Sequence, residues 1–107
     1  MIIYNVTVNV DESIHEEWLE WIKNHIPKVL ATGQFTGAKL TKVLVEEEMG
    51  GITYSIQYNA ISKANLKTYY TEHANALRQE GQRRFGDNNL AFRTELELVD
   101  EYNVTFS

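Results

Sequence analysis

The chain of 107 residues contains no cysteine and a single proline. Without cysteine it can form no disulfide, thiolate nucleophile, cysteine-based zinc site or cysteine-ligated iron–sulfur cluster. This absence fits a reducing cytosol, so we expect a cytoplasmic location. No apolar run approaches the roughly 18 residues of a membrane-spanning helix, and the start, MIIYNVTVNV, has no basic region typical of a signal peptide. We therefore expect no membrane association.

Basic residues are also scarce, because ten Lys and Arg stand against fifteen Asp and Glu, for a net charge of −5. Phosphate contacts dominate nucleic-acid affinity, so this balance argues against a nucleic-acid partner. The chain has no HExxH pattern and no glycine-rich phosphate loop after its first strand. We accordingly expect neither a metal nor a cofactor. The length predicts one domain over residues 1–107, with residues 100–107 as a C-terminal extension.

Alternating and helical periodicities divide the chain into six elements. Pro27 should end or bend the first helix near residues 24–26, before a short turn closed by Gly33. A slip in the alternation between Leu40 and Val43 suggests a bulge in the second strand. The turn EEMGG should form a hairpin, and Ser62 should cap the second helix. The predicted elements are strands 2–10, 38–47, 52–60 and 90–99, and helices starting at about 14 and spanning about 63–84.

This order, βαββαβ, predicts a ferredoxin-like α+β plait. Two right-handed crossovers joined by a hairpin give a four-stranded antiparallel sheet with both helices on one face. The first and third strands should lie in the centre. Tyr54 and Tyr58 should then face the helices, which removes them from a possible base-stacking surface.

The opposite face of the two central strands is polar, small and uncharged. It carries Asn5, Thr7, Thr53, Ser55 and Gln57. Simple exposure to solvent is one explanation. A second subunit packed over the sheet, as in the dimeric α/β barrels, is the explanation we favour, because unpaired charges are costly to bury. The last residues, YNVTFS, could form a short strand on a partner or on the chain's own body.

Four blocks, HEEWLEWIKNHIP, ATGQF, GGITYSIQY and AFRTELELVD, carry a resemblance. Together they resemble an uncharacterised family of short bacterial proteins, a domain of unknown function. The resemblance covers nearly the whole chain, from MIIYNVTVN to ELVDEY. It implies a ferredoxin-like fold related to the dimeric α/β barrels. It implies no reaction and no catalytic residue.

Candidate proton-transfer residues lie on both helices. His15 falls in the first turn of the first helix, where the helix dipole favours a neutral imidazole. Tyr69, His73 and Glu80 share one shoulder of the second helix and could act as a proton-transfer set. Structural hydrogen bonding explains the same spacings. His25, near the end of the first helix, could bond the last carbonyls there.

Candidate ligand-binding residues are Trp21, Arg84 and Arg93. Trp21 lies at the edge of the apolar stripe and could line a pocket mouth or an interface. Arg84 belongs to a late cluster with Arg78 and Arg83. That cluster could simply complement the negative end of the helix, or it could form an anion site with Arg93.

Three functional hypotheses follow. The first is a homodimeric α/β-barrel protein that binds a small molecule or a partner, without established catalysis. The second is a cofactor-independent enzyme, such as a small monooxygenase or isomerase. Its substrate would lie between the helices and the sheet, beside the catalytic candidates His15, Tyr69 and His73. The third is a structural or regulatory dimerisation module.

Overall fold

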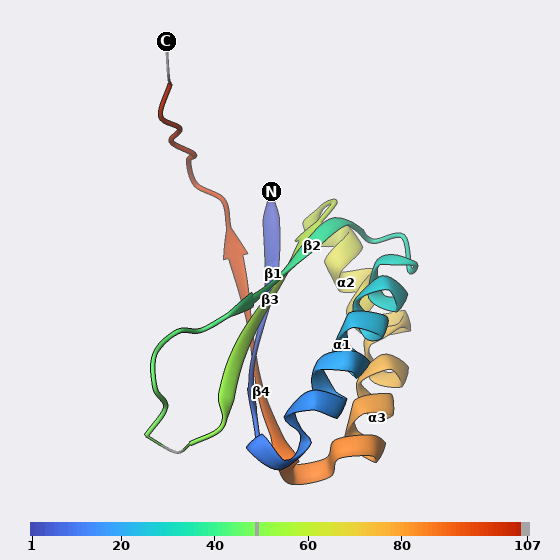
Figure 1. Ribbon diagram of the computed structural model, residues 1–107. Helices are drawn as coiled ribbons and strands as arrows, with labels where there is room; N and C mark the ends of the chain where they lie inside the picture. Colours follow the sequence, from blue (N-terminus) through green and yellow to red (C-terminus); the bar gives the residue numbers. More distant parts are fainter. Residues whose placement is uncertain (49, 106–107) are drawn as a thin grey trace.

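The computed structural model describes residues 1–48 and 50–105 (Figure 1). It confirms the order of strands and helices that the sequence predicts, apart from a break in the second helix. The elements are, in chain order, β1 (Ile2–Val10), η1 (Glu12–Ile14), α1 (His15–Leu30), β2 (Phe35–Lys42), β3 (Ile52–Ala60), α2 (Lys63–Glu72), α3 (Ala74–Phe85), η2 (Gly86–Asn88) and β4 (Asn89–Glu97).

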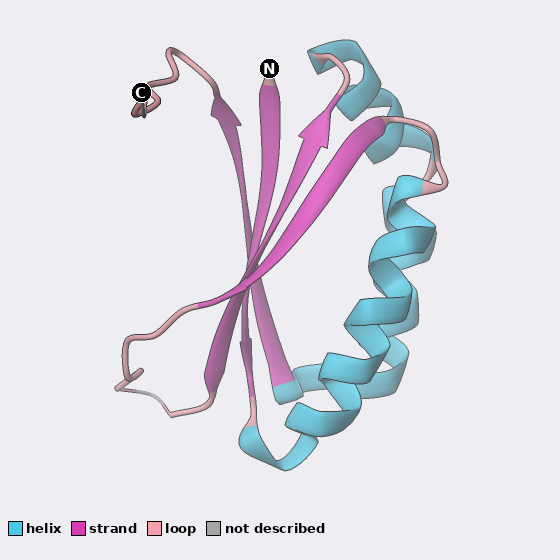
Figure 2. Ribbon diagram, turned by 45° about the horizontal axis from the view of Figure 1, so that its top comes forward, coloured by secondary structure: helices cyan, strands magenta, loops and turns pink. Residues whose placement is uncertain are grey.

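The four strands form one antiparallel sheet in the order β2-β3-β1-β4. The helices all lie on one face of it (Figure 2). The first and third strands are central, as the plait requires. The opposite face has no helix over it among the described residues. The predicted ferredoxin-like α+β fold is therefore confirmed.

The core lies between this sheet and the helices. Every second residue of β1 and β3 points toward the helices, as the alternation predicts, and all of these are buried except the half-buried Ile2 and Ile52 that open the strands. Trp18 and Ile56 are each 1% exposed. Full burial of one such side chain contributes roughly 1.5–3 kcal/mol. The largest fully buried side chains are Trp18, Tyr4, Ile56, Leu66, Val10 and Val29.

The sequence predicts that Pro27 ends or bends the first helix. The helix does not end there but continues through Pro27 to Leu30. Proline inside a helix removes one hydrogen bond and costs about 3 kcal/mol. Val29 in the last turn is completely buried, and the Ala31 N–H donates to the Pro27 carbonyl at 2.9 Å. Packing of this last turn on the core offsets the cost, which the local sequence does not reveal.

The second strand is also displaced from its predicted span of 38–47. It begins at Phe35, which is buried in the core, and the register slips between Phe35 and Gly37 and not between Leu40 and Val43. Leu44 is 90% exposed, so the apolar residues after Lys42 extend past the paired region.

The hairpin turn predicted at EEMGG includes Met49, which lies outside the described residues. Gly51, which ends it, has φ +77°. A Cβ there would lie 2.8 Å from both Asn9 Oδ1 and the Val10 carbonyl, so only glycine fits. This close approach ties the hairpin to the end of β1.

The second helix is two helices, α2 and α3, with the break at His73. The backbone of His73 has φ −126°, yet its N–H still donates to the Tyr69 carbonyl at 2.9 Å. Ser62 caps α2 as predicted, since its hydroxyl accepts from the Asn65 N–H at 3.1 Å. No glycine or proline marks the break, so helical periodicity alone could not locate it.

The last strand spans 89–97 instead of 90–99. Its final contact with β1 is the Leu98 N–H bond to the Met1 carbonyl at 2.9 Å. Residues 102–105 form no strand, and 106–107 lie outside the described part of the chain. Tyr102 and Val104 are exposed. Within the described residues no strand pairs with this segment, which extends away from the body (Figure 1).

Candidate functional site

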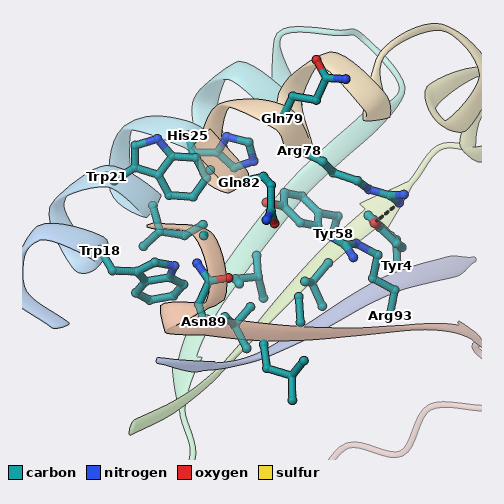
Figure 3. Close-up of a pocket in the computed structure, with 18 of the residues that line it drawn as sticks. Tyr4, Trp18, Trp21, His25, Tyr58, Arg78, Gln79, Gln82, Asn89 and Arg93 are labelled. Atoms are coloured by element: carbon teal, nitrogen blue, oxygen red, sulfur yellow. Dashed lines mark hydrogen bonds between the residues drawn. The ribbon is translucent and has the colours of Figure 1, made fainter. Parts of the chain in front are cut away.

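A groove of about 500 Å³ lies between α1, α3 and the β1–β4 side of the sheet (Figure 3). The groove exists because β4 extends the sheet past the region that apolar side chains of the helices cover. Ala91 and Arg93 of β4 line it, and they stand opposite Val8 and Val6 of β1. The volume falls in the range of small-molecule sites, roughly 300–1,000 Å³.

One wall of the groove is aromatic. Trp21 stacks on His25, one turn later in α1, with ring centroids 4.4 Å apart. It also meets Phe85 of α3 edge-on at 5.6 Å. Gly81 of α3 makes room for the indole, because a Cβ there would lie 2.8 Å from Trp21 Cη2. Gly81 therefore leaves the space that the Trp21 indole occupies against α3.

His25 is the histidine of the groove. Its Nδ1 is buried and has no hydrogen-bond partner among the described residues. Burial lowers the pKa of His25, and the nearby Glu80 carboxylate opposes that shift. The neutral imidazole is therefore favoured near pH 7. Because Nδ1 has almost no accessible surface, a molecule in the groove meets the neutral ring of His25 and not this nitrogen.

The other end of the groove is cationic. Arg78 of α3 donates to the Tyr4 hydroxyl at 2.9 Å, and its guanidinium lies 6.0 Å from the centre of the Tyr70 ring. Arg93 reaches from β4 toward Tyr4 and Tyr58 (Figure 3). Within residues 1–48 and 50–105, neither arginine forms an ion pair with a carboxylate.

Three tyrosines lie beneath these arginines. Burial raises the pKa of Tyr58, and it raises that of Tyr69 to about 12. The positive charge of Arg93 partly opposes both shifts. Tyr4 is 2% exposed. Tyr58 and Tyr69 therefore keep their hydroxyl protons at neutral pH, and they bring no negative charge to the groove.

The predicted catalytic histidines lie elsewhere. His15 Nε2 is 2.6 Å from the Tyr54 hydroxyl, at a different depression whose lining includes three glutamates. His73 stacks on Tyr69 at a centroid distance of 6.5 Å. Among the residues that the structure describes, neither imidazole lines the groove, whereas Tyr69 does.

The predicted set of Tyr69, His73 and Glu80 is divided. Glu80 pairs with Lys28 of α1 at 2.8 Å, on the far side of the aromatic wall. Hydrogen bonding with Lys28 lowers the Glu80 pKa. The shared helix shoulder is broken because α2 ends at Glu72, before two of the three residues.

Of the predicted ligand-binding residues, Trp21 and Arg93 line the groove. Arg84 instead lies over the Phe85 ring at 5.5 Å. The sequence favours mainly structural roles for His25 and Arg78, although both line the groove. It does indicate that Arg78 and Arg93 could share an anion site. Spacing along the chain does not show that α3 and β4 line the same groove.

Within the described residues, no cluster of three or more His, Asp or Glu side chains could hold a metal ion. No helix in that part of the chain is long and apolar enough to cross a bilayer.

The strand order, the helical layer and the groove between them define a ferredoxin-like α+β protein. Within that class, the chain belongs to the family described as a domain of unknown function, DUF4286, whose model matches residues 1–99. No curated protein matches the chain.

Several solved structures share the fold. A dimeric ferredoxin-like protein from an uncultured marine organism has a TM-score of 0.64 at 10% identity, covering 94% of this chain and 97% of that one. An ethyl tert-butyl ether d (ethd) family protein from Bacillus halodurans has a TM-score of 0.65 at 13% identity, covering 91% and 98%. A "putative antibiotic biosynthesis monooxygenase" from Deinococcus radiodurans has a TM-score of 0.58 at 15% identity, covering 99% and 100%. Identities this low establish the fold alone.

Proposed function

We propose that this protein is a homodimer that binds a small molecule in the groove between its helices and its sheet. The observation that carries the binding function is the groove itself. It combines an aromatic wall at Trp21 and His25 with polar groups that have unused hydrogen-bonding capacity, at Arg78 and Arg93. Apolar walls with a few convergent polar groups are typical of ligand sites.

A fragment screen tests the binding function. We expect bound fragments to shift the backbone amide NMR signals of α3 and β4 beside the groove. Ala91→Phe should fill the groove and weaken those fragments, while Lys39→Ala, on the open face of β2, should leave them unchanged. Far-UV circular dichroism would verify that both variants fold. Fragments that bind equally well to Ala91→Phe, or that shift no groove amide, would show the proposed site to be wrong.

The homodimer rests on the open face of the sheet, where β4 exposes a row of apolar side chains. The row consists of Leu90, Phe92, Leu96 and Leu98, and it is 38% to 60% exposed. The register places this row beside β1, whose side chains on the same face are Ile3, Asn5, Thr7 and Asn9. An exposed apolar row of this size on a small domain is typical of an interaction surface.

The polar part of this open face is largely satisfied within the chain. Asn5 accepts from the Ser55 hydroxyl at 2.7 Å, and its amide donates to Thr7 and Thr94 at 3.3 Å. The Asn9 amide donates to Thr53 at 3.2 Å. Because these groups already bond one another, covering them with a second sheet costs less than covering unpaired groups. Gln57 stands on the same face, opposite Asn5.

A second copy is the occupant that we propose for this face. The two central strands carry no charged side chain on this face, and its charges lie at the margin, on Lys39 of β2 and on Glu47 beside Thr53. Two identical surfaces can therefore meet about a two-fold axis with uncharged centres. The solved dimeric ferredoxin-like relative supports this choice of partner. Light scattering should give about twice the chain mass of 12.4 kDa. A monomer at micromolar concentration would contradict the homodimer and leave the groove's function standing.

A cofactor-independent enzyme remains the second candidate function, and His25 favours it. Its lowered pKa leaves the imidazole free of a proton near pH 7, as a general base must be. The ring would have to turn to bring the buried Nδ1 to a substrate. The sequence candidates His15 and His73 lie away from the groove, so catalysis there would depend on a different histidine. The dimerisation module, by contrast, would leave the groove without a role.

A further inference from the structure

The groove is electrostatically polarised along β4. Arg93 and Arg78 lie at one end, while Asp87 lies beyond Asn89 at the other. Four residues of strand separate Asn89 from Arg93, which corresponds to about 13 Å. A ligand that lies along β4 therefore meets positive charge at one end only, in a protein whose net charge is −5.

Neutral groups hold Arg78 in place. The Tyr4 hydroxyl accepts one N–H of Arg78, and the Tyr70 ring lies beside its guanidinium. A guanidinium has five N–H donors, so most of those on Arg78 stay available. Glu95 lies two residues beyond Arg93 on the same face of β4, yet no ion pair joins the two within the described chain.

Between the charged end and Asp87, the accessible wall is planar and aromatic. Trp21 and His25 are stacked on each other and half-buried, so each leaves part of its ring open to the groove. Figure 3 shows them on α1, across from Arg78 and Arg93, with Gln82 reaching between the two ends. His25 is favoured in its neutral form, so this wall adds no second cationic centre.

We propose that the groove recognises a planar aromatic carboxylate. The carboxylate lies against Arg93 and Arg78, and the ring system extends along β4 toward Trp21. A guanidinium matches a carboxylate in a two-pronged hydrogen-bonding geometry. An aromatic ring that stacks on a tryptophan gains more than an aliphatic ring of the same size. This inference rests on the proposed small-molecule function and specifies its ligand class.

Three probes separate the parts of this proposal. 2-Naphthoate carries both the ring and the charge, 2-naphthamide carries the ring without the charge, and cyclohexanecarboxylate carries the charge without the aromatic ring. Each is titrated into the full ¹⁵N-labelled chain at low salt, and affinity is taken from the shifts of the groove amides. We expect naphthoate to bind at least about tenfold more tightly than naphthamide, as charge-assisted hydrogen bonds predict.

Amino-acid substitutions test which residues cause the difference in affinity between naphthoate and naphthamide. Arg93→Gln should remove most of the preference for naphthoate over naphthamide, because naphthoate loses a charge-assisted hydrogen bond while naphthamide loses only a weaker bond to its neutral oxygen. Arg78→Gln should act in the same direction. It also breaks the bond to Tyr4, so Arg93→Gln is the cleaner variant. Arg84→Gln is the matched control, because Arg84 is on the same helix but lies over Phe85, and it should keep the wild-type preference.

The outcomes distinguish this inference from the broader function. Equal affinity for naphthoate and naphthamide would overturn carboxylate recognition and leave a ligand-binding groove. Equal affinity for naphthoate and cyclohexanecarboxylate would overturn the aromatic requirement. If none of the three probes shifts a groove amide up to its solubility limit while screened neutral fragments do, the inference fails alone. If no fragment binds either, the proposed function fails with it.

Discussion

The distribution of polar and apolar side chains between the two faces of the sheet is reversed on β4 compared with the central strands. β1 and β3 point buried side chains toward the helices and neutral polar ones away, as Val6 and Thr7 do. On β4 the helix-side positions include Arg93, and the open-side positions include Phe92 and Leu96. The difference shows that what covers a position decides its chemistry. The helix side of β4 borders a groove, whereas its open side lacks a cover in the single chain.

The reversal explains how one edge strand could serve two roles. Its charged side would meet a ligand, and its apolar side would meet a second subunit. The central strands need no such reversal, because the helices already cover their apolar side. Changes on β4 should therefore affect binding or assembly, while changes on the central strands should affect folding.

The largest expected effect comes from placing a charge in the apolar row. Phe92 is 60% exposed in the single chain. In a two-fold interface the substitution Phe92→Lys occurs twice, facing apolar surface each time. We expect light scattering to show a monomer at concentrations where the wild type is a dimer. Leu44→Lys, at an exposed leucine outside the strands, is the control. A Phe92→Lys variant that remains dimeric would place the interface elsewhere.

The next effect compares two neighbours on β3. Ile56 is 1% exposed on the helix side, and Ile→Ala at such a site costs about 2–5 kcal/mol. Ser55 faces the other way and loses one hydrogen bond to Asn5 on Ser55→Ala, at a cost of about 1 kcal/mol. Urea unfolding at one fixed protein concentration would measure both losses. Equal losses would mean that the two faces are packed alike.

Substitution of Gly81 should change stability little but should clearly change the groove. Gly81→Ala favours the helix by up to about 1 kcal/mol, but the new Cβ would stand 2.8 Å from Trp21. The indole must move, so we expect little net change in urea stability together with a shifted tryptophan emission spectrum and weaker fragment binding. Asn75→Ala, at an exposed position of the same helix away from the groove, is a control without that contact. Unchanged emission and binding would show that Trp21 is not fixed by Gly81.

Much of this comparison could be predicted from the sequence, because alternation within a strand is a local signal. It placed Tyr54 and Tyr58 under the helices, and both are buried. It could not show that Pro27 stays inside α1, since buried Val29 stabilises that turn through contacts distant in the sequence. The groove was equally hidden. Only the assembled fold of α3, β4 and α1 brings Arg78, Arg93 and His25 to one groove. Spacing along the chain therefore favoured His15 and His73 as site residues instead.

The smallest expected effect tests the neutral wall of the groove through pH. Burial lowers the folded-state pKa of His25 below its ordinary value of 6.5. The unfolded chain then binds a proton at a higher pH than the folded one. The stability linked to neutral His25 is therefore fully present above about pH 6.5 and is lost as the pH falls through the window below it. We expect the urea stability of the wild type to decline over that window more than that of His25→Gln.

The imidazole NMR signal of His25 should titrate with a midpoint below 6.5. Glu80→Gln should lower this midpoint further, because the Glu80 carboxylate favours the charged imidazole. A midpoint above 6.5 would mean that His25 carries charge in the groove, and the wall beside Trp21 would then be a second cationic centre.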